Sequence, residues 1–307
     1  MRDKHRPLIG LTLNYRDAAR TSRCVASLLA DGADGVLVWD NSADGGRSAQ
    51  ALCQHWVHEP RVHIEVSTRN LGFSAGVNRG IDAALARWPQ AWVLLINNDA
   101  TLHRGALQTL AQALNAQPQA VVAYPRVDHD GQVIGTVYYQ RLFALLRFDR
   151  AWPGSFSYPS GSALLIAPER IRPPLFDEDF FMYGEDVMLG WRLGASRMAH
   201  VPQVLAWHEG SASSRNGSWF YETHVVARNA CGGGALAACQ EAGPHKARAV
   251  AAARRPHGQP APARPGTFMA ITQPAAAQGI GGRLALSPWP ISVLSLPPAQ
   301  EVLPIWE

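Results

Sequence analysis

The stretch WVLLINND, residues 92–99, places five apolar residues directly before three polar ones. A short apolar run that ends in polar residues is typical of a buried strand. The same pattern occurs at residues 8–14 and 35–40, and a helical spacing of apolar residues follows each of these two runs. Strands that alternate with helices favour right-handed βαβ units, so the sequence predicts an α/β fold with a mostly parallel sheet.

Polar side chains follow the predicted strands where each strand ends. Asn14, Asp40, Asn70 and Asp99 lie at or just past the ends of successive apolar runs. In open parallel sheets, ligands bind beyond the carboxyl ends of the strands. We therefore expect these residues to line one ligand site.

A second acidic cluster lies further along the chain. Residues 176–193 hold five Asp and Glu residues among large apolar and aromatic ones. Neighbouring carboxylates repel one another and are costly to desolvate. Glu185 and Asp186 begin an amphipathic pattern that predicts a helix with both carboxylates in its first turn. Such a carboxylate is a candidate general base, and a helix cap with surface acids explains the same pattern.

The composition, 47% hydrophobic and 17% charged residues, is that of a globular protein. The net charge of +4 is too small to indicate a nucleic-acid partner, and the candidate site is acidic. The first residues lack the apolar run of a signal peptide, and the four cysteines form no CxxC pair. We expect a cytoplasmic protein, with or without surface contact to the inner face of the membrane.

The sequence changes character near its C-terminal quarter. Residues 231–307 hold 11 of the 22 prolines and are rich in Ala and Gly. Sequence of this kind buries little apolar surface and is expected to be poorly ordered. The predicted organisation is therefore a domain over residues 1–229 and a tail over residues 230–307.

Taken in order, the motifs resemble those of a family 2 glycosyltransferase, in particular the rhamnosyltransferase-like branch that builds bacterial surface polysaccharides. The resemblance covers residues 8–229 and rests on five motifs: Leu13-Asn14-Tyr15, Trp39-Asp40-Asn41-Ser42, Asn70-Leu71-Gly72-Phe73 through Asn78-Arg79-Gly80, Asn97-Asn98-Asp99, and Gly184-Glu185-Asp186 with Trp207-His208. It implies the GT-A fold, in which a mostly parallel nucleotide-binding sheet is flanked by helices and followed by a C-terminal acceptor-side region.

The resemblance also implies a role for each motif. Asp99 would bind Mn²⁺ or Mg²⁺ with His208 as a further ligand, and Asp186 or Glu185 would be the catalytic base. Asn97 replaces the first acid of the family's D-x-D motif, which lowers the negative charge at the site. The residues assigned to the nucleotide-sugar donor are Asn14, Tyr15, Asp40, Asn70, Gly72, Asn78, Asn97 and Asn98.

The implied reaction is inverting transfer of a sugar, with rhamnose suggested by the branch, from a nucleotide-diphospho-sugar to a saccharide or lipid-linked acceptor. Such a reaction belongs to surface polysaccharide synthesis. Residues 193–202 form a shorter segment than family members have, at the end of the helix that carries the expected base. The alternative is therefore a catalytically impaired protein of the same fold that binds a nucleotide sugar.

Overall fold

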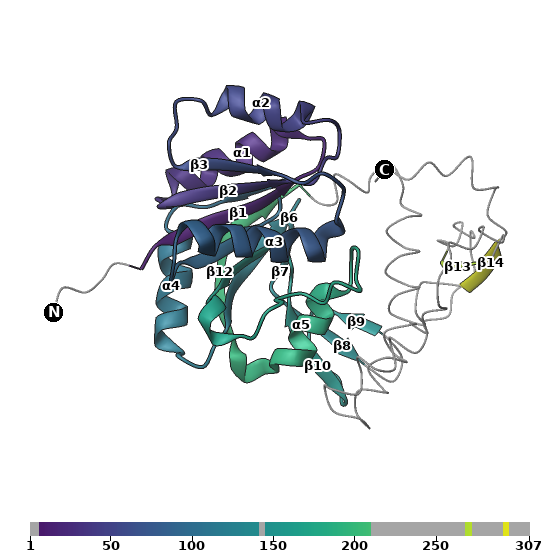
Figure 1. Cartoon of the computed structure of the whole chain (residues 1–307). Coiled ribbons are helices and arrows are strands. Elements are labelled where there is room, and N and C mark those ends of the chain that lie inside the picture. Colours follow the sequence, from purple (N-terminus) through teal and green to yellow (C-terminus); the bar gives the residue numbers. More distant parts are fainter. Residues whose placement is uncertain (1–5, 141–144, 210–267, 272–290, 295–307) are drawn as a thin grey trace. The chain divides into compact units, whose positions relative to one another are not determined.

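The structure is a computed structural model that describes residues 6–140, 145–209, 268–271 and 291–294 (Figure 1). The chain divides into two compact units, Met1–Ala212 and Ser213–Glu307. In the second unit, β13 (Phe268–Ile271) pairs antiparallel with β14 (Ile291–Leu294). The expected domain boundary at residue 229, and the expected tail apart from these two strands, lie outside the described residues.

The first half of the first unit alternates strands with helices, as the sequence predicts. Its elements are β1 (Leu8–Asn14), α1 (Ala18–Ala30), β2 (Gly35–Asp40), α2 (Arg47–His55), β3 (Val62–Val66), α3 (Gly72–Arg87) and β4 (Trp92–Ile96). Asp17 caps α1, because its side chain accepts a hydrogen bond from the Arg20 N–H.

The second half is richer in strands. Its elements are β5 (Ala100–Leu102), α4 (Ala106–Ala116), β6 (Val122–His129), β7 (Gln132–Ile134), β8 (Thr136–Gln140), β9 (Leu145–Arg147), β10 (Ser155–Pro159), β11 (Ala163–Ile166), α5 (Glu185–Leu193) and β12 (Met198–His208). Two short 3₁₀ turns, Pro168–Arg170 and Ala195–Arg197, precede and follow α5.

Within the described part of the chain, nine strands form the main sheet in the order β3-β2-β1-β4-β11-β6-β12-β5, with β7 paired to β6. The pairs β3–β2, β2–β1 and β1–β4 are parallel, and so is β6–β12. β11 lies centrally and runs antiparallel to both β4 and β6. The mostly parallel sheet brings the strand ends expected to bind ligand to one edge, where Asn14 pairs with Asp40.

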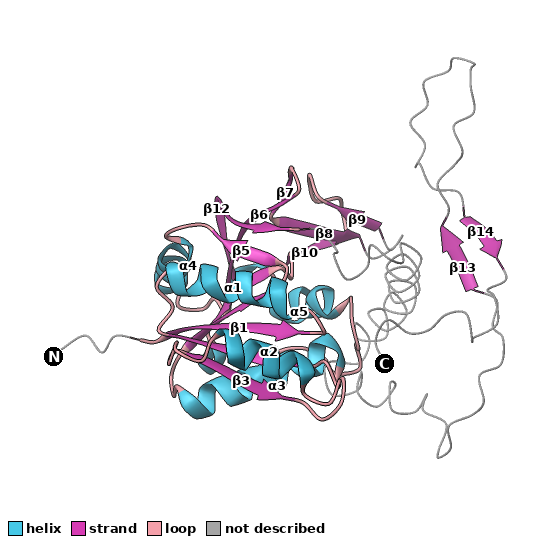
Figure 2. Cartoon of the chain, turned by 90° about the horizontal axis from the view of Figure 1, so that it is seen from above, coloured by secondary structure: helices cyan, strands magenta, loops and turns pink. Residues whose placement is uncertain are grey.

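Helices cover both faces of this sheet (Figures 1 and 2). Side chains of α1, α2 and α4 pack in one hydrophobic cluster, and side chains of α3 and α5 pack in the other. β4 contributes to both, because alternate residues of a strand point to opposite faces. Leu94 and Ile96 belong to the first cluster, whereas Val93 and Leu95 belong to the second. The strand that leads into Asn97 is thus buried on both sides.

α5 is held between the main sheet and a small antiparallel sheet of order β10-β8-β9. Leu189 and Leu193 pack in the cluster on the main sheet, and the Trp191 ring lies 5.1 Å from the Phe156 ring of β10. A Cβ added to Gly190 would lie 2.3 Å from the Cβ of Tyr158. This close packing fixes the position of the helix whose first turn carries Glu185 and Asp186.

Candidate active site

The first part of the site is the buried carboxylate of Asp40 at the end of β2. Its Oδ1 accepts hydrogen bonds from the Asn14 side chain (2.8 Å) and from the backbone and hydroxyl of Ser42. All three residues are buried. Asp40 Oδ2 is buried without a hydrogen-bond partner in the described residues. A buried carboxylate oxygen needs a donor, so this atom is suited to accept a hydrogen bond from a ligand.

Tyr15 directly follows Asn14, the residue whose side chain donates to Asp40. The Arg16 guanidinium lies 5.2 Å from the Tyr15 ring centroid, and the Arg16 N–H donates to the Ser42 hydroxyl (2.8 Å). Burial raises the pKa of Tyr15, although the Arg16 charge acts in the opposite direction. The phenol therefore keeps its proton at neutral pH and can donate a hydrogen bond.

The Asn70–Gly72 turn uses its polar groups within the protein. The Gly72 N–H donates to Asn70 Oδ1 (2.9 Å), and the Phe73 N–H donates to the Phe181 carbonyl (2.6 Å). Gly72 has φ +77°, and an added Cβ would lie 2.4 Å from the Phe181 carbonyl oxygen. The first two amides of α3 are therefore not available to a phosphate. Glycine is therefore needed at position 72, both for the positive φ and for the close approach to Phe181 in the acidic segment.

Asn78, which was expected to bind the donor, makes side-chain hydrogen bonds within the protein. Its side-chain amide donates to the Phe176 carbonyl (2.9 Å) and to Glu178 Oε1 (3.1 Å), and its Oδ1 accepts from the Phe176 N–H (3.0 Å). Asn78 is buried, so these bonds are shielded from water. They tie α3 to the acidic segment that leads into α5.

The structure brings Asn97, Asp99 and His208 together where β4 and β12 end. His208 Nε2 lies 3.1 Å from Asp99 Oδ1 and 3.1 Å from Asn97 Nδ2. Asn97 Oδ1 is buried without a hydrogen-bond partner in the described residues. His208 Nε2 thus faces an amide nitrogen and a carboxylate oxygen, and a proton or a cation between Nε2 and Asp99 Oδ1 would be bound by both of these atoms.

This arrangement fits a divalent cation. Adjacent ligands of an octahedral ion lie about 3 Å apart when each is about 2.1 Å from the metal, which matches the separation of Asp99 Oδ1 and His208 Nε2. The described residues contain no group of three or more His, Cys, Asp or Glu side chains that could hold a metal. Substrate phosphates and water would have to complete the coordination, as is common for Mg²⁺ sites.

His129 is a neighbour of this site that the sequence did not reveal. β6 and β12 pair in a register that sets His129 opposite His208, and the two ring centroids lie 4.8 Å apart. Burial, together with the neighbouring His208, lowers the pKa of His129 to about 4. A neutral His129 adds no positive charge that would repel a cation beside His208.

Asn98 faces α1. Its side-chain amide donates to the Thr21 hydroxyl (3.1 Å), which lies 2.8 Å from Asn14 Oδ1. Since Asn14 also donates to Asp40, a chain of buried and partly buried hydrogen bonds joins the Asp40 carboxylate to Asn98, the residue that precedes Asp99.

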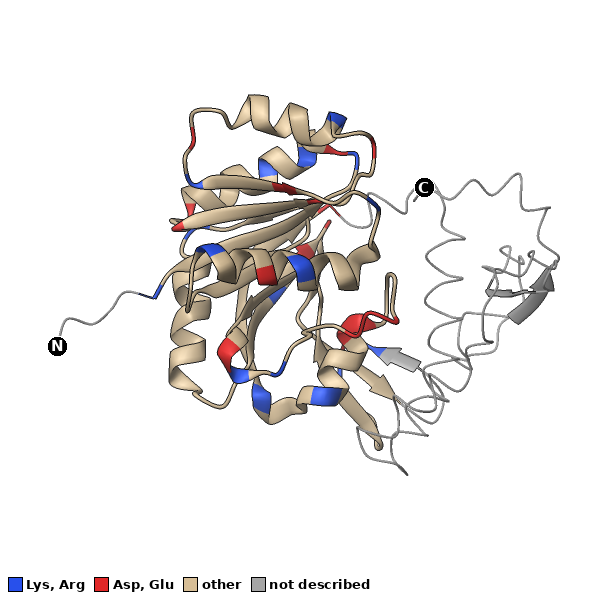
Figure 3. Cartoon of the chain, in the orientation of Figure 1, with Lys and Arg blue, Asp and Glu red and all other residues tan. Residues whose placement is uncertain are grey.

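The carboxylates of Glu185 and Asp186 occupy the first turn of α5, and Figure 3 shows acidic positions gathered at this end of the helix. Asp186 Oδ1 accepts from the Val187 N–H (2.8 Å). Burial raises the pKa of Asp186 to about 6, although hydrogen bonds from the Val187 and Gly161 amides act in the opposite direction. Asp186 thus has the raised pKa of a general base that works near neutral pH.

Backbone contacts connect Asp186 to the loop that holds Asn97 and Asp99. The Gly161 amide interacts with the Asp186 carboxylate, and the carbonyl of the next residue, Ser162, accepts from the Asn97 N–H (3.1 Å). The adjacent residues Ala163 and Ile96 are paired in the β11–β4 ladder. The turn before β11 is therefore the element that joins the α5 carboxylate to the loop of Asn97 and Asp99.

The mostly parallel sheet with polar strand ends, joined to a carboxylate-bearing helix, agrees with a GT-A fold, and sequence comparison shows the family. The model of the family described as "Glycosyl transferase family 2" matches residues 11–167, more than half of the 307 residues, and the chain belongs to this family. The match ends before α5 and His208, so the placement of those two features rests on the structure.

One relative is the N-acetylglucosaminyl-diphospho-decaprenol L-rhamnosyltransferase of Mycobacterium tuberculosis. It is 28% identical over 245 residues, which cover 68% of this chain and 77% of the relative.

Comparison with solved structures shows the fold through one of them. The crystal structure of GalNAc-T7 with UDP, GalNAc and Mn²⁺ superposes with a TM-score of 0.54 at 13% identity, over 67% of this chain. This chain spans 44% of that protein's length. A structure of residues 1–349 of S. aureus TarS has a TM-score of 0.46 at 14% identity, over 73% of this chain and 64% of that one.

Proposed function

We propose that the protein is a metal-dependent, inverting glycosyltransferase that uses a nucleotide-diphospho-sugar. The observation that carries the proposal is the contact between the side chains of Asp99 and His208, whose Oδ1 and Nε2 atoms lie 3.1 Å apart. The loop that holds Asp99 is joined through Gly161 and Ser162 to Asp186. A cation site and a general base on neighbouring elements are the two groups that direct displacement of a nucleotide diphosphate requires.

The Asp40 pocket would bind the nucleoside. Asp40 Oδ2 would accept a hydrogen bond from a base N–H or a ribose hydroxyl, because Oδ1 already accepts from Asn14 and Ser42. Tyr15, whose phenol stays protonated, would donate to the same nucleotide. The hydrogen-bond chain through Thr21 would hold this pocket in register with the diphosphate.

Asp99 and His208 would hold Mn²⁺ or Mg²⁺, and the cation would neutralise the negative charge of the leaving diphosphate. The nitrogen ligand suits Mn²⁺ better than Mg²⁺. Asn97 lies against His208 and would orient its ring without adding charge. The chain's own contribution is therefore one carboxylate, one imidazole and one amide that face a common point.

Asp186 would accept the proton of the acceptor hydroxyl as that oxygen attacks the anomeric carbon. The bond to the diphosphate breaks on the opposite face of the sugar, so the anomeric configuration inverts. The pKa of about 6 leaves Asp186 ionised at neutral pH and basic enough to share the proton in the transition state. Glu185, buried in the same helical turn, is the second candidate for this role.

For the substrates we propose rhamnose as the sugar and a saccharide or lipid-linked saccharide as the acceptor, in surface polysaccharide synthesis. The name of the mycobacterial relative supports both choices, since it describes L-rhamnosyl transfer to a decaprenol-linked sugar. A lipid-linked acceptor would bring the enzyme to the inner face of the membrane. Among the described residues, no helix is both long enough and apolar enough to cross a bilayer.

A panel of nucleotide sugars that includes dTDP-rhamnose tests the proposal. We expect one donor to raise the melting temperature in the presence of Mn²⁺, and chelation to remove that shift. The same donor should then support transfer, with NMR showing inverted configuration in the product. Binding without turnover would support the impaired protein instead, and a product with retained configuration would refute direct displacement.

A further inference from the structure

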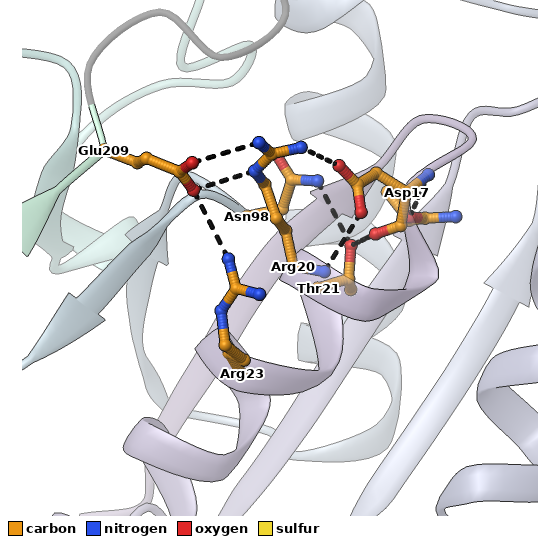
Figure 4. A network of polar contacts seen from close by, with 7 residues as sticks. Asp17, Arg20, Thr21, Arg23, Asn98 and Glu209 are labelled. Atoms are coloured by element: carbon orange, nitrogen blue, oxygen red, sulfur yellow. Dashed lines mark hydrogen bonds and ion pairs between the residues drawn. The ribbon is translucent and has the colours of Figure 1, made fainter.

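Three side chains on the N-terminal half of α1 point at the two loops that carry the proposed metal ligands. Figure 4 shows Arg20 and Arg23 directed at Glu209, and Thr21 directed at Asn98. Asn98 directly precedes Asp99, and Glu209 directly follows His208. Each proposed ligand is thus one residue away from a side chain held by α1.

Arg20 holds Glu209 through a two-pronged ion pair. Arg20 Nε lies 2.8 Å from Glu209 Oε2, and Arg20 Nη2 lies 3.0 Å from Oε1. Asp17 accepts from the remaining guanidinium nitrogen, which fixes the orientation of Arg20 (Figure 4). A bidentate pair specifies geometry more strictly than a single contact does.

Glu209 transmits this geometry to the proposed ligands. Its backbone N–H donates to the Asp99 carbonyl (3.0 Å), while its other backbone neighbour is His208. Ala100, which follows Asp99, pairs with His208 in the antiparallel ladder of β5 and β12. The Glu209–Asp99 hydrogen bond extends this ladder by one step, so the backbone around Glu209 and the backbone around Asp99 are held together.

Thr21 supplies the second connection. Its hydroxyl is fully buried, accepts from Asn98 Nδ2 (3.1 Å), and lies 2.8 Å from both Asn14 Oδ1 and the Asp17 carbonyl. Thr21 thus ties the loop of Asp99 to the Asp40 pocket, while Arg20 ties the end of β12 to the same helix.

We propose that Arg20 and Thr21 are positioning residues that keep Asp99 and His208 at the spacing a divalent cation needs. The proposal rests on the proposed function, because it takes these two residues as the metal ligands. A cation accepts ligand distances within only about 0.2 Å of their ideal values. Groups that orient metal ligands are accordingly worth about 10- to 100-fold in metal affinity.

The test compares Arg20→Gln with Arg61→Gln, which removes a bidentate pair of similar geometry with Glu59 at 2.8–2.9 Å, ahead of β3. Calorimetry measures the affinity for UDP or dTDP, whichever binds the wild type more tightly, with Mn²⁺ and with chelator. We expect Arg20→Gln to lose about 10-fold of the Mn²⁺-dependent affinity and to keep the affinity measured in chelator. Arg61→Gln should keep both.

Electron paramagnetic resonance of bound Mn²⁺, recorded on the same variants, reads out metal affinity without any turnover. Combining Arg20→Gln with Glu209→Gln should cost clearly less than the sum of the two single losses, because both changes remove the Arg20–Glu209 ion pair. Each change also removes one contact of its own, Arg20 with Asp17 and Glu209 with Arg23. Additive losses would show that Arg20 acts by another route and would overturn the proposal for this pair.

Thr21→Val and Thr21→Ser test the second connection independently of Arg20. Valine removes the hydroxyl at nearly constant volume, and serine keeps it, so only Thr21→Val should weaken Mn²⁺-dependent binding. If the wild type binds the nucleotide equally well with Mn²⁺ and with chelator, both the proposed function and the positioning role are refuted. If the nucleotide affinity of the wild type depends on Mn²⁺, and both Arg20→Gln and Thr21→Val keep that dependence in full, only the positioning role is refuted.

Discussion

At the scale of single residues, opposing effects act on the charge of the Asp186 carboxylate. The Val187 N–H and the Gly161 amide stabilise its ionised form, whereas burial destabilises that form and is the larger effect. The resulting pKa of about 6 is well above that of an exposed aspartate. Two consequences can be measured, one for activity and one for stability.

The first prediction is a pH profile. If Asp186 is the base, kcat/KM should fall about tenfold per pH unit below about pH 6, because the protonated carboxyl cannot accept the acceptor's proton. Initial rates between pH 4.5 and 8 at saturating Mn²⁺ provide the measurement. If kcat/KM stays constant down to pH 5, a group other than Asp186 accepts the proton of the acceptor hydroxyl.

The second prediction concerns Asp186→Asn. A raised pKa means that the folded protein holds this proton more tightly than the unfolded chain does. The resulting stability is fully present at low pH and is lost as the pH rises through about 6. At pH 7.5 the ionised carboxylate should therefore destabilise the fold by about 1 to 3 kcal/mol. Asp186→Asn should abolish transfer, keep nucleotide binding and raise the melting temperature at that pH.

Thermal unfolding at pH 7.5 and at pH 4 checks the sign, since the stabilising effect of Asp186→Asn should shrink at the lower pH. Asp82→Asn is the matched control, because it removes a carboxylate on α3 whose side chain is 62% exposed. If the Asp186→Asn variant transfers sugar at the normal rate, Asp186 is not the base, whatever the melting temperature of the variant.

Individual residues also show what the sequence could and could not predict. Asp40 and Asp99 follow apolar runs, so their place at the edge of a parallel sheet is a local consequence of the pattern. Asn78 looks like a motif residue, yet its amide is used by the backbone of Phe176, 98 positions away. His129 gave no signal, because only the register of β6 against β12 brings it to His208.

At the scale of elements, α5 depends on how closely it approaches β10. Gly190 lies within α5, where alanine ordinarily stabilises a helix by about 0.5–1 kcal/mol relative to glycine. Here an added Cβ would lie 2.3 Å from the Tyr158 Cβ and 2.8 Å from the Ser157 carbonyl oxygen. Both distances are shorter than a Cβ can tolerate, and the backbone of Ser157 and Tyr158 could move away only at a cost in stability.

The third prediction is that Gly190→Ala destabilises the protein and reduces transfer, reversing the sign expected from helix propensity. We expect a loss of about 1–3 kcal/mol, typical of overpacking, and a lower kcat because α5 carries Glu185 and Asp186. Nucleotide affinity should change little, since the Asp40 pocket lies on other strands. Chemical denaturation and steady-state kinetics measure the two effects.

Gly32→Ala is the control for Gly190→Ala. Gly32 has φ +88° and nothing within 4 Å of an added Cβ, so alanine there adds backbone strain without a clash. It should cost about 1 kcal/mol and leave kcat unchanged. A Gly190→Ala protein as stable as wild type would show that α5 can move away from β10.

The elements also differ in how far the sequence predicts them. β1, β2 and β4, and the helices that follow β1 and β2, have local apolar patterns that predict them, and the structure confirms these elements. The pairing of β12 with β6 and β5 was not predicted. Its partners are more than 70 residues earlier in the chain, and no local pattern encodes that choice.

At the scale of the whole molecule, the first unit contains both hydrophobic clusters and every proposed site residue. Both clusters draw their buried residues from positions 9–206, and Glu209 makes the last hydrogen bond that the site uses. The contact division between Ala212 and Ser213 lies just beyond these residues, whereas the sequence pattern favours a boundary near residue 229. We propose that residues 1–229 contain the complete catalytic domain.

The last prediction tests both boundaries with chains truncated after residue 212 and after residue 229. Because the described core is complete by position 206, both should unfold cooperatively within a few degrees of the full chain, as followed by circular dichroism. Both should also keep Mn²⁺-dependent nucleotide binding, since Asp40, Asp99 and His208 remain. If only the longer chain folds, residues 213–229 complete the domain and the boundary lies where the sequence put it. If neither folds, the second unit supplies part of the stability of the first, and the division by contacts does not mark an independent folding unit.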